Sequence, residues 1–271
     1  MLLVLAGAAL HAAWNVAIRA GGDRRQETAL LSAAGALLAV AILPFLRQPL
    51  PAAWPHLLLT AALHGVYYAL VAEAYTRGGV ALAYPLMRGT APLLTTLAAW
   101  AVLGERLPPV AWAGIGGICA GVALLARRRG EPAERTAVLF ALANAVVIAS
   151  YTLNDAIGAR ESGSPVAYTL WTFALSAVPT LLWLSRFGVL RRPHRVQALR
   201  AAGGAACSIG SYGLALWAMT QAPVAPVSAL RETAMLFGLV LARLVLGERP
   251  GARGWAAAGA IALGAAALRL A

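Results

Sequence analysis

The chain of 271 residues is 61% hydrophobic and only 12% charged, a balance that excludes an ordinary water-soluble domain. Its formal net charge is +12, and all 22 basic residues are arginines. Most of them lie in short breaks between apolar runs, so we attribute the charge to orientation in a membrane and expect no nucleic-acid partner. The two cysteines, Cys119 and Cys207, stand alone in apolar segments, which indicates neither a metal site nor a cofactor.

Apolar runs repeat along the whole chain. A helix of roughly 20 apolar residues crosses the hydrocarbon of a bilayer, which is about 30 Å thick. Runs of about this length fall at 2–20, 28–46, 54–76, 80–103, 109–126, 136–156, 165–187, 197–220, 223–246 and 252–270. The sequence therefore predicts an all-α membrane protein with ten transmembrane helices, and we expect it to span the bacterial inner membrane many times.

The two halves of the sequence repeat each other. A shift of 143 residues lays 88–126 over 231–269 without a gap, and 17 of the 39 positions are identical. Matched glycines, tryptophans and charged residues do not follow from an Ala- and Leu-rich composition. We predict one five-helix repeat at 1–130 and a second at 131–271. Because each repeat holds an odd number of helices, the second enters the membrane from the opposite side.

The segment from Tyr84 to Pro92, with Leu103-Gly-Glu-Arg106 after it, resembles the EamA-type members of the drug/metabolite transporter superfamily. The second half carries the matching segments Ala225–Arg231 and Leu246-Gly-Glu-Arg249, and the resemblance covers nearly the whole chain. It implies ten helices, transport by secondary means and no enzyme activity. The family's substrates are diverse, so the resemblance is specific for the fold and weak for the substrate.

Five charged residues fall inside or near the ends of the predicted helices, where charge is costly and usually functional or paired. They are Glu73, Arg88, Asp155, Arg231 and Glu232. Arg88 and Arg231 could hold a carboxylate or phosphoryl group of a substrate by forked hydrogen bonds. Alternatively, they pair with the acidic residues and fasten the helices together. The three carboxyl groups are candidates for proton coupling or ion pairing.

Polar and aromatic residues on shared helix faces complete the predicted substrate site. His11, Trp14 and Asn15 have the spacing i, i+3, i+4, which places them on one face. Such a stripe should turn away from lipid, toward the interior of the bundle. The other candidates are His64, Tyr68, Tyr84, Tyr151, Asn154 and Tyr212.

Two further patterns are interpreted as structural. The Gly-Glu-Arg segments at 104–106 and 247–249 are expected to end helices. Glycines between 114 and 121 and between 254 and 264 form small-residue surfaces for close helix packing, either between the halves or between the subunits of a homodimer. Arginines favour the breaks after odd-numbered helices by 15 to 4, which places both termini outside, whereas the resemblance implies that they lie inside.

We expect a secondary transporter of a small polar metabolite, such as an amino-acid-like zwitterion or an organic anion. Its site lies at mid-membrane between the two repeats, and proton coupling or exchange supplies the energy. The alternative is a translocator of lipid or lipid-linked substrates on the same fold. A membrane enzyme is the weakest reading, because the chain has no HExxH or HxxxxD spacing, and no GxxxxGK[ST] run indicates ATP hydrolysis.

Overall fold

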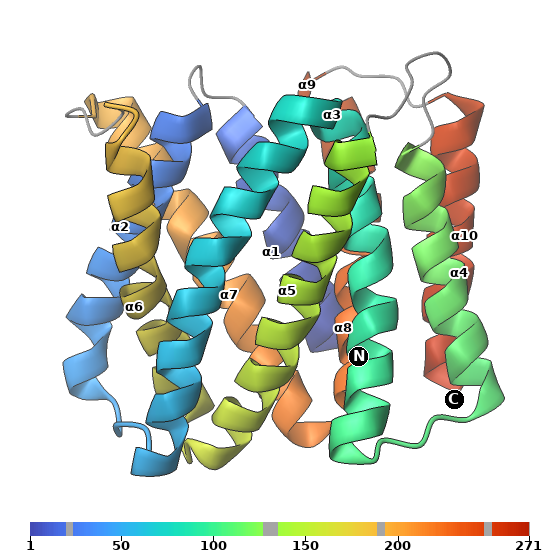
Figure 1. Ribbon diagram of the computed structural model, residues 1–271, viewed down its shortest axis with the longest axis horizontal. Helices are drawn as coiled ribbons and strands as arrows, with labels where there is room; N and C mark the ends of the chain where they lie inside the picture. Colours follow the sequence, from blue (N-terminus) through green and yellow to red (C-terminus); the bar gives the residue numbers. More distant parts are fainter. Residues whose placement is uncertain (20–23, 127–134, 189–192, 247–250, 271) are drawn as a thin grey trace. The chain divides into compact units, whose positions relative to one another are not determined.

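The computed structural model describes residues 1–19, 24–126, 135–188, 193–246 and 251–270, apart from the side chains of some residues next to the gaps and within helices. These residues form helices and no β-strand. The α-helices are α1 Leu2–Arg19, α2 Arg24–Ile42, α3 Trp54–Leu103, α4 Pro109–Ala126, α5 Arg135–Glu161, α6 Pro165–Ser185, α7 Arg195–Gln221, α8 Val224–Arg231, α9 Ala234–Leu246 and α10 Ala252–Leu270 (Figure 1). Two short 3₁₀ turns, η1 Leu43–Phe45 and η2 Pro51–Ala53, connect α2 to α3.

Helix α3 joins two of the predicted spans, 54–76 and 80–103, without a break. A straight helix of its 50 residues would measure about 75 Å, far more than the thickness of a bilayer. Figure 1 shows that α3 instead reverses direction near its middle. Gly78, Gly79 and Pro85 fall in that stretch, and residues of these types commonly mark helix kinks. The chain thus makes two membrane crossings with one bent helix.

The predicted span 223–246 is divided into α8 and α9. Between them, the N–H groups of Glu232 and Thr233 bond to the carbonyl groups of Ala229 and Leu230, three residues earlier. This tighter turn interrupts the α-helical ladder where the sequence changes from a Pro-containing segment to a largely apolar one.

Five segments of the described chain are long and apolar enough to cross a membrane: Arg25–Phe45, Pro51–Arg77, Leu86–Leu103, Arg135–Glu161 and Pro165–Ser185. Three shorter apolar helices cover Leu2–Trp14, Pro109–Leu124 and Ala252–Leu268. The predicted class, an all-α membrane protein, is confirmed.

The chain divides into two compact units, and each takes segments from both halves of the sequence. Unit 1 contains Val66–Leu153 and Ala222–Ala271, together with Met1, whereas unit 2 contains Leu2–Gly65 and Asn154–Gln221. The boundaries fall inside α3 and α5, so each of these helices contributes to both units.

In unit 1, α4 and α10 cross with their backbones almost in contact. A Cβ atom on Gly121 would lie 2.7 Å from Ile261 Cγ1 and 2.9 Å from the carbonyl oxygen of Ala257. A Cβ atom on Gly264 would lie 2.8 Å from Ile118 Cγ1 and 2.5 Å from the carbonyl oxygen of Gly114. The 143-residue shift places Gly121 over Gly264 and Ile118 over Ile261, so the two contacts are equivalent in the two halves of the sequence. The small-residue surfaces therefore pack the two halves together along an approximate two-fold axis.

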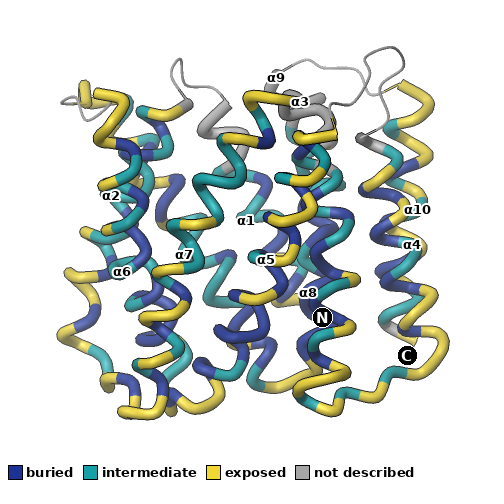
Figure 2. The backbone as a smooth tube through the Cα atoms, in the orientation of Figure 1, coloured by how far each residue is buried: buried dark blue, intermediate teal, exposed yellow. Residues whose placement is uncertain are grey.

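The outer faces of the same two helices are apolar. Figure 2 shows buried and exposed positions alternating along α4 and α10. Among the exposed side chains are Leu263, which is 74% exposed, Trp255 and Trp112. An apolar exposed face is what a helix presents to lipid.

One of the two Gly-Glu-Arg segments, 104–106, lies in unit 1, and its contacts are structural. Gly104 ends α3 in the left-handed region, with φ of 66°, which glycine adopts without strain. The Glu105 carboxylate then accepts hydrogen bonds from the N–H groups of Val224, at 2.6 Å, and Ala225, at 3.2 Å. These are the first two residues of α8, where an anion is favoured by the helix dipole. The matching segment 247–249 lies outside the described residues.

In unit 2, α1 packs along α7, and α2 packs against α6 and α7. Close approach again depends on glycines: a Cβ atom on Gly7 would lie 3.1 Å from the carbonyl oxygen of Ser211. Glu27, which is buried, lies 3.3 Å from Arg200 Nη1 and so ties α2 to α7.

Candidate functional site

A buried ion pair in unit 1 joins the two halves of the sequence. Arg88 Nη2 lies 2.9 Å from Glu232 Oε1, and the two side chains are 12% and 6% exposed. Arg88 lies in the second arm of α3, and Glu232 lies in the turn after α8. Both charges are compensated away from water, so loss of either partner would leave the other buried and unpaired.

Each partner of this pair retains one unused hydrogen-bonding atom. Within the described part of the chain, Arg88 Nε and Glu232 Oε2 are buried and have no hydrogen-bond partner. Guanidinium and carboxylate groups commonly form two parallel hydrogen bonds, whereas this contact joins one atom of each. An acceptor and a donor on one ligand would match these two unused atoms.

Tyrosines surround Arg88. The phenol groups of Tyr67, Tyr84 and Tyr151 lie close enough to its guanidinium to interact with it electrostatically. The rings of Tyr67 and Tyr151 meet edge to face with centroids 6.2 Å apart, and Tyr67 meets Tyr68 similarly at 5.1 Å. These phenols supply both aromatic faces and hydroxyl groups to the surroundings of the ion pair.

The repeat is asymmetric at this position. Arg231 is the counterpart of Arg88, and the counterpart of Glu232 is Gly89. The carboxylate therefore comes from the second half alone. Arg231 interacts with Glu232 electrostatically, but the close contact to that carboxylate is made by Arg88. Arg88 contacts Glu232 in the structure, and its role in binding a substrate stays a prediction.

Unit 2 holds a different buried carboxylate, Asp155 on α5. Thr60 of α3 and Tyr168 of α6 both donate to Oδ1, the latter at 2.9 Å. Tyr212 of α7 donates to Oδ2. His64, one turn after Thr60 on α3, interacts with Asp155 electrostatically. Three hydroxyl groups from three helices thus converge on one carboxylate.

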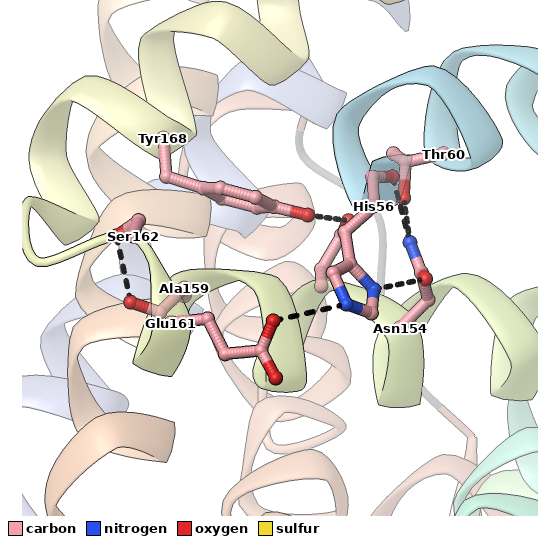
Figure 3. Close-up of polar contacts among 8 residues, drawn as sticks. His56, Thr60, Asn154, Ala159, Glu161, Ser162 and Tyr168 are labelled. Carbon is pink, nitrogen blue, oxygen red and sulfur yellow. Dashed lines mark hydrogen bonds and ion pairs between the residues drawn. The ribbon is translucent and has the colours of Figure 1, made fainter. Parts of the chain in front are cut away.

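Thr60, which donates to this carboxylate, also begins a polar chain that runs through Asn154 and His56 to Glu161 (Figure 3). Asn154 Nδ2 donates to Thr60 Oγ1 at 2.8 Å and to the carbonyl oxygen of His56 at 2.8 Å. Asn154 Oδ1 lies 2.7 Å from His56 Nδ1, and His56 Nε2 lies 3.3 Å from Glu161 Oε2. Glu161 is exposed. Both ring nitrogens of His56 thus face side-chain oxygen atoms.

The remaining predicted site residues lie elsewhere. Trp14 Nε1 donates to His11 Nδ1 at 3.3 Å, a contact within α1, and the side chain of Asn15 lies outside the described residues. Glu73 is exposed and pairs with Arg77 at 2.9 Å, one turn along α3. Among the described contacts, none joins His11, Trp14 or Glu73 to either buried carboxylate.

Sequence reasoning missed Thr60, Tyr168 and His56. The signal for two of them was present, because His56, Thr60 and His64 follow one another at intervals of four and share a face of α3. It also missed Asn144, whose Nδ2 lies 2.9 Å from Met87 Sδ in unit 1. Nothing in the local sequence distinguishes Asn144 from a packing residue.

Apolar helices in two matching halves, with buried charges joined across those halves, define a multi-pass membrane protein of the transporter type. The sequence pattern of the EamA-like transporter family matches residues 1–127 and 135–270, so the chain belongs to that family. The family is part of the drug/metabolite transporter superfamily, and the predicted resemblance is confirmed.

Comparison with a solved structure supports the fold and carries no information about function. A solved structure described only as "Crystal structure of protein" is 22% identical, with a TM-score of 0.81, and covers 99% of this chain and 96% of its own. A search of curated proteins found no match. Membership in a transporter family argues against the membrane-enzyme alternative.

Proposed function

We propose that the chain is a secondary transporter of small zwitterionic metabolites of the amino-acid type, and that Arg88 and Glu232 bind the substrate. One observation carries this proposal: the buried pair leaves one unused hydrogen-bonding atom on each partner. A substrate carboxylate would bind Arg88, and its ammonium group would bind Glu232. The net charge of the buried site would remain zero, which limits the cost of burial.

An organic anion is the second candidate class. Its carboxylate could also bind Arg88, but the negative charge of Glu232 would then oppose it. The anion would require that Glu232 accept a proton or move away. The tyrosines around Arg88 suit either class, since aromatic faces and hydroxyl groups contact rings, ammonium groups and carboxylates.

Transport would proceed by alternating access, in which the binding site opens to one side of the membrane at a time. The turn between α8 and α9 replaces α-helical bonding at Glu232, and interrupted helices near buried ionic groups are a common feature of transport sites. Proton coupling or substrate exchange would supply the energy. Because the described chain crosses the membrane with helices and outer-membrane proteins are closed β-barrels, we place the transporter in the bacterial inner membrane. A homodimer is compatible with this proposal but is not required by it.

The test is counterflow in liposomes that contain the purified protein. The panel comprises amino acids, matching organic acids that lack the amino group, amines, phosphonates and a short-chain lipid. We expect exchange of an amino acid, with a fall of roughly 10- to 100-fold in apparent affinity for Arg88→Ala, since hydrogen bonds to charged groups contribute about 1.5–3 kcal/mol. The matched control is Arg77→Ala, which breaks an exposed pair on the same helix.

Glu232→Gln separates the two substrate classes. The amide keeps the shape of the side chain but removes its charge. If the substrate is a zwitterion, the variant should lose affinity for the amino acid and gain affinity for the matching organic acid. Exchange of the lipid alone would favour the translocator alternative. Unchanged flux of every substrate in Arg88→Ala and Arg231→Ala would overturn the site.

A further inference from the structure

Asp155 in unit 2 is a buried carboxylate held by hydroxyl groups. It is fully buried, and its hydrogen-bond partners are Thr60, Tyr168 and Tyr212. Among the described residues, no arginine forms an ion pair with it, and the chain contains no lysine. A charge buried in this way within a membrane protein is expensive and is usually tied to function.

The hydroxyl partners allow Asp155 to be stable with or without a proton. An ionised carboxylate accepts hydrogens only, and all three hydroxyl groups can donate to it. A protonated carboxyl group must donate one hydrogen, and a hydroxyl oxygen can accept it after rotation about its C–O bond. An arginine partner cannot make this change, because guanidinium groups only donate. The Asp155 site therefore accommodates both states, whereas the Arg88–Glu232 pair is suited to one.

Each helix that donates a hydrogen bond to Asp155 also carries an ionisable group near it. Helix α3 contributes His64, helix α6 contributes Tyr168, and helix α7 contributes Tyr212. His64 Nδ1 lies 2.9 Å from the carbonyl oxygen of Thr60, so this nitrogen carries a hydrogen and Nε2 is the atom of the ring that can take up a proton.

Thr60 donates to Asp155, and the polar chain in Figure 3 leads from Thr60 through Asn154 and His56 toward the exposed Glu161. Thr60 connects Asp155 to Asn154, Asn154 connects to His56, and His56 faces Glu161. The amide of Asn154 does not itself pass a proton. It contacts both His56 and Thr60, which lie four residues apart on one face of α3, and His64 follows Thr60 after another four residues.

We propose that Asp155 is the proton-binding site of this transporter. The inference rests on the proposed function and deepens it by naming the residue that couples transport to protons. When Asp155 is ionised, charge-assisted hydrogen bonds tie α5 to α3, α6 and α7, and such bonds are roughly twice as strong as neutral ones. When Asp155 takes up a proton, these bonds become neutral and weaker. Proton binding thereby loosens the four helices, and proton release tightens them.

Infrared spectroscopy of the purified protein tests proton binding without any transport. As the pH falls, the difference between the wild-type and Asp155→Asn spectra should gain the C=O stretching band of one protonated carboxyl group, while the bands of the other carboxyl groups cancel. The matched control is Glu27→Gln, because Glu27 is also buried in unit 2 but is paired with Arg200. Absence of a band from this difference spectrum, or the same band in the difference between the wild type and Glu27→Gln, would overturn the inference.

Two milder variants cover the case in which Asp155→Asn does not fold. Tyr168→Phe and Tyr212→Phe each remove one hydroxyl group from the carboxylate and keep the ring. Each should shift the pH midpoint of the carboxyl band, because the hydroxyl group bonds to the ionised form. An unchanged midpoint in both variants would show that the band belongs to another residue and would overturn the assignment.

Transport assays distinguish a failure of this inference from a failure of the proposed function. Counterflow needs no proton gradient, so Asp155→Asn should retain it, whereas uphill accumulation driven by a pH gradient should be lost. Loss of both activities in a folded variant would mean that Asp155 binds substrate or is needed for every conformational change, and would overturn the coupling role. Failure of the proposed function would instead appear as unchanged flux in Arg88→Ala, whatever the behaviour of Asp155.

Discussion

The two compact units bury their carboxylates in different ways. In unit 1, Glu232 is compensated by Arg88, and the helices around it approach each other through glycines. In unit 2, Asp155 is compensated by hydroxyl groups, and its helices are joined by side-chain hydrogen bonds. An ion pair fixes one charge state, whereas hydroxyl groups tolerate two. The comparison suggests that unit 1 recognises charge on a substrate and that unit 2 responds to protons.

The largest effect should follow from breaking the ion pair of unit 1. Arg88→Ala leaves Glu232 buried without its partner, and removal of one member of a buried pair costs about 3–5 kcal/mol. We expect a large fall in the melting temperature of the detergent-solubilised protein. Arg77→Ala, which breaks the exposed pair with Glu73, should cost about 0–1 kcal/mol.

The double variant Arg88→Leu, Glu232→Leu sharpens this prediction. Replacing both charges with apolar groups removes the unpaired charge, so much of the lost stability should return. Substrate exchange should remain absent, since both binding groups are gone. Recovery of exchange in the double variant would show that the pair serves the fold and not the substrate.

The next largest effect is expected where α4 and α10 cross at glycines in unit 1. Gly264→Ala would place a Cβ atom 2.5 Å from the carbonyl oxygen of Gly114, a backbone atom that cannot move alone. Overpacking of this kind typically costs about 1–3 kcal/mol, measurable as a lower melting temperature. Gly116→Ala is the control, because nothing lies within 4 Å of the added atom. Equal melting temperatures for the two variants would contradict the close crossing of α4 and α10.

Tyr212→Phe tests the three hydroxyl groups that bond to Asp155 in unit 2. Loss of one hydrogen bond to a charged group should destabilise the protein by about 1.5–3 kcal/mol at a pH where Asp155 is ionised. The loss should shrink as Asp155 is protonated at lower pH, which thermal melts over a range of pH would detect. Ser150→Ala, which removes a hydroxyl group bonded only to its own helix, should show little change at any pH.

The smallest effect is expected at the start of α8. Glu105→Gln replaces the charged acceptor of two N–H groups with a neutral one and should cost about 0.5–1 kcal/mol. Substrate affinity should stay unchanged if Glu105 serves only as a helix cap. A change in affinity without a change in melting temperature would instead place Glu105 in the transport site.

Much of the fold could be predicted from the sequence, because apolar length and repetition act over whole helices. The 143-residue shift matches Gly121 with Gly264, and the structure brings both to the crossing, whereas the matched Gly116 and Gly259 have no close neighbours. The bend that joins 54–76 to 80–103 could not be predicted, since Gly78 and Gly79 favour a loop as readily as a kinked helix.

The contacts of individual polar residues were less predictable. Charge in an apolar run marked Arg88, Glu232 and Asp155, but their partners depend on how distant helices meet. Thr60 and Tyr168 carry no charge, and their spacing resembles that of packing residues. Which residues gather at Asp155 is set by the packing of four helices, which no local pattern records.

The contact between Glu105 and the start of α8 bears on how members of the family can be classified. The Gly-Glu-Arg segment makes the sequence easy to recognise, yet its glutamate binds the backbone N–H groups of Val224 and Ala225, which every sequence possesses. A shared Gly-Glu-Arg segment is thus evidence of common architecture and carries no information about cargo. On the two proposals made above, relatives of this chain are better sorted by the side chains at positions 88, 155 and 232, where an exchange of charge is expected to change the cargo or the energy source.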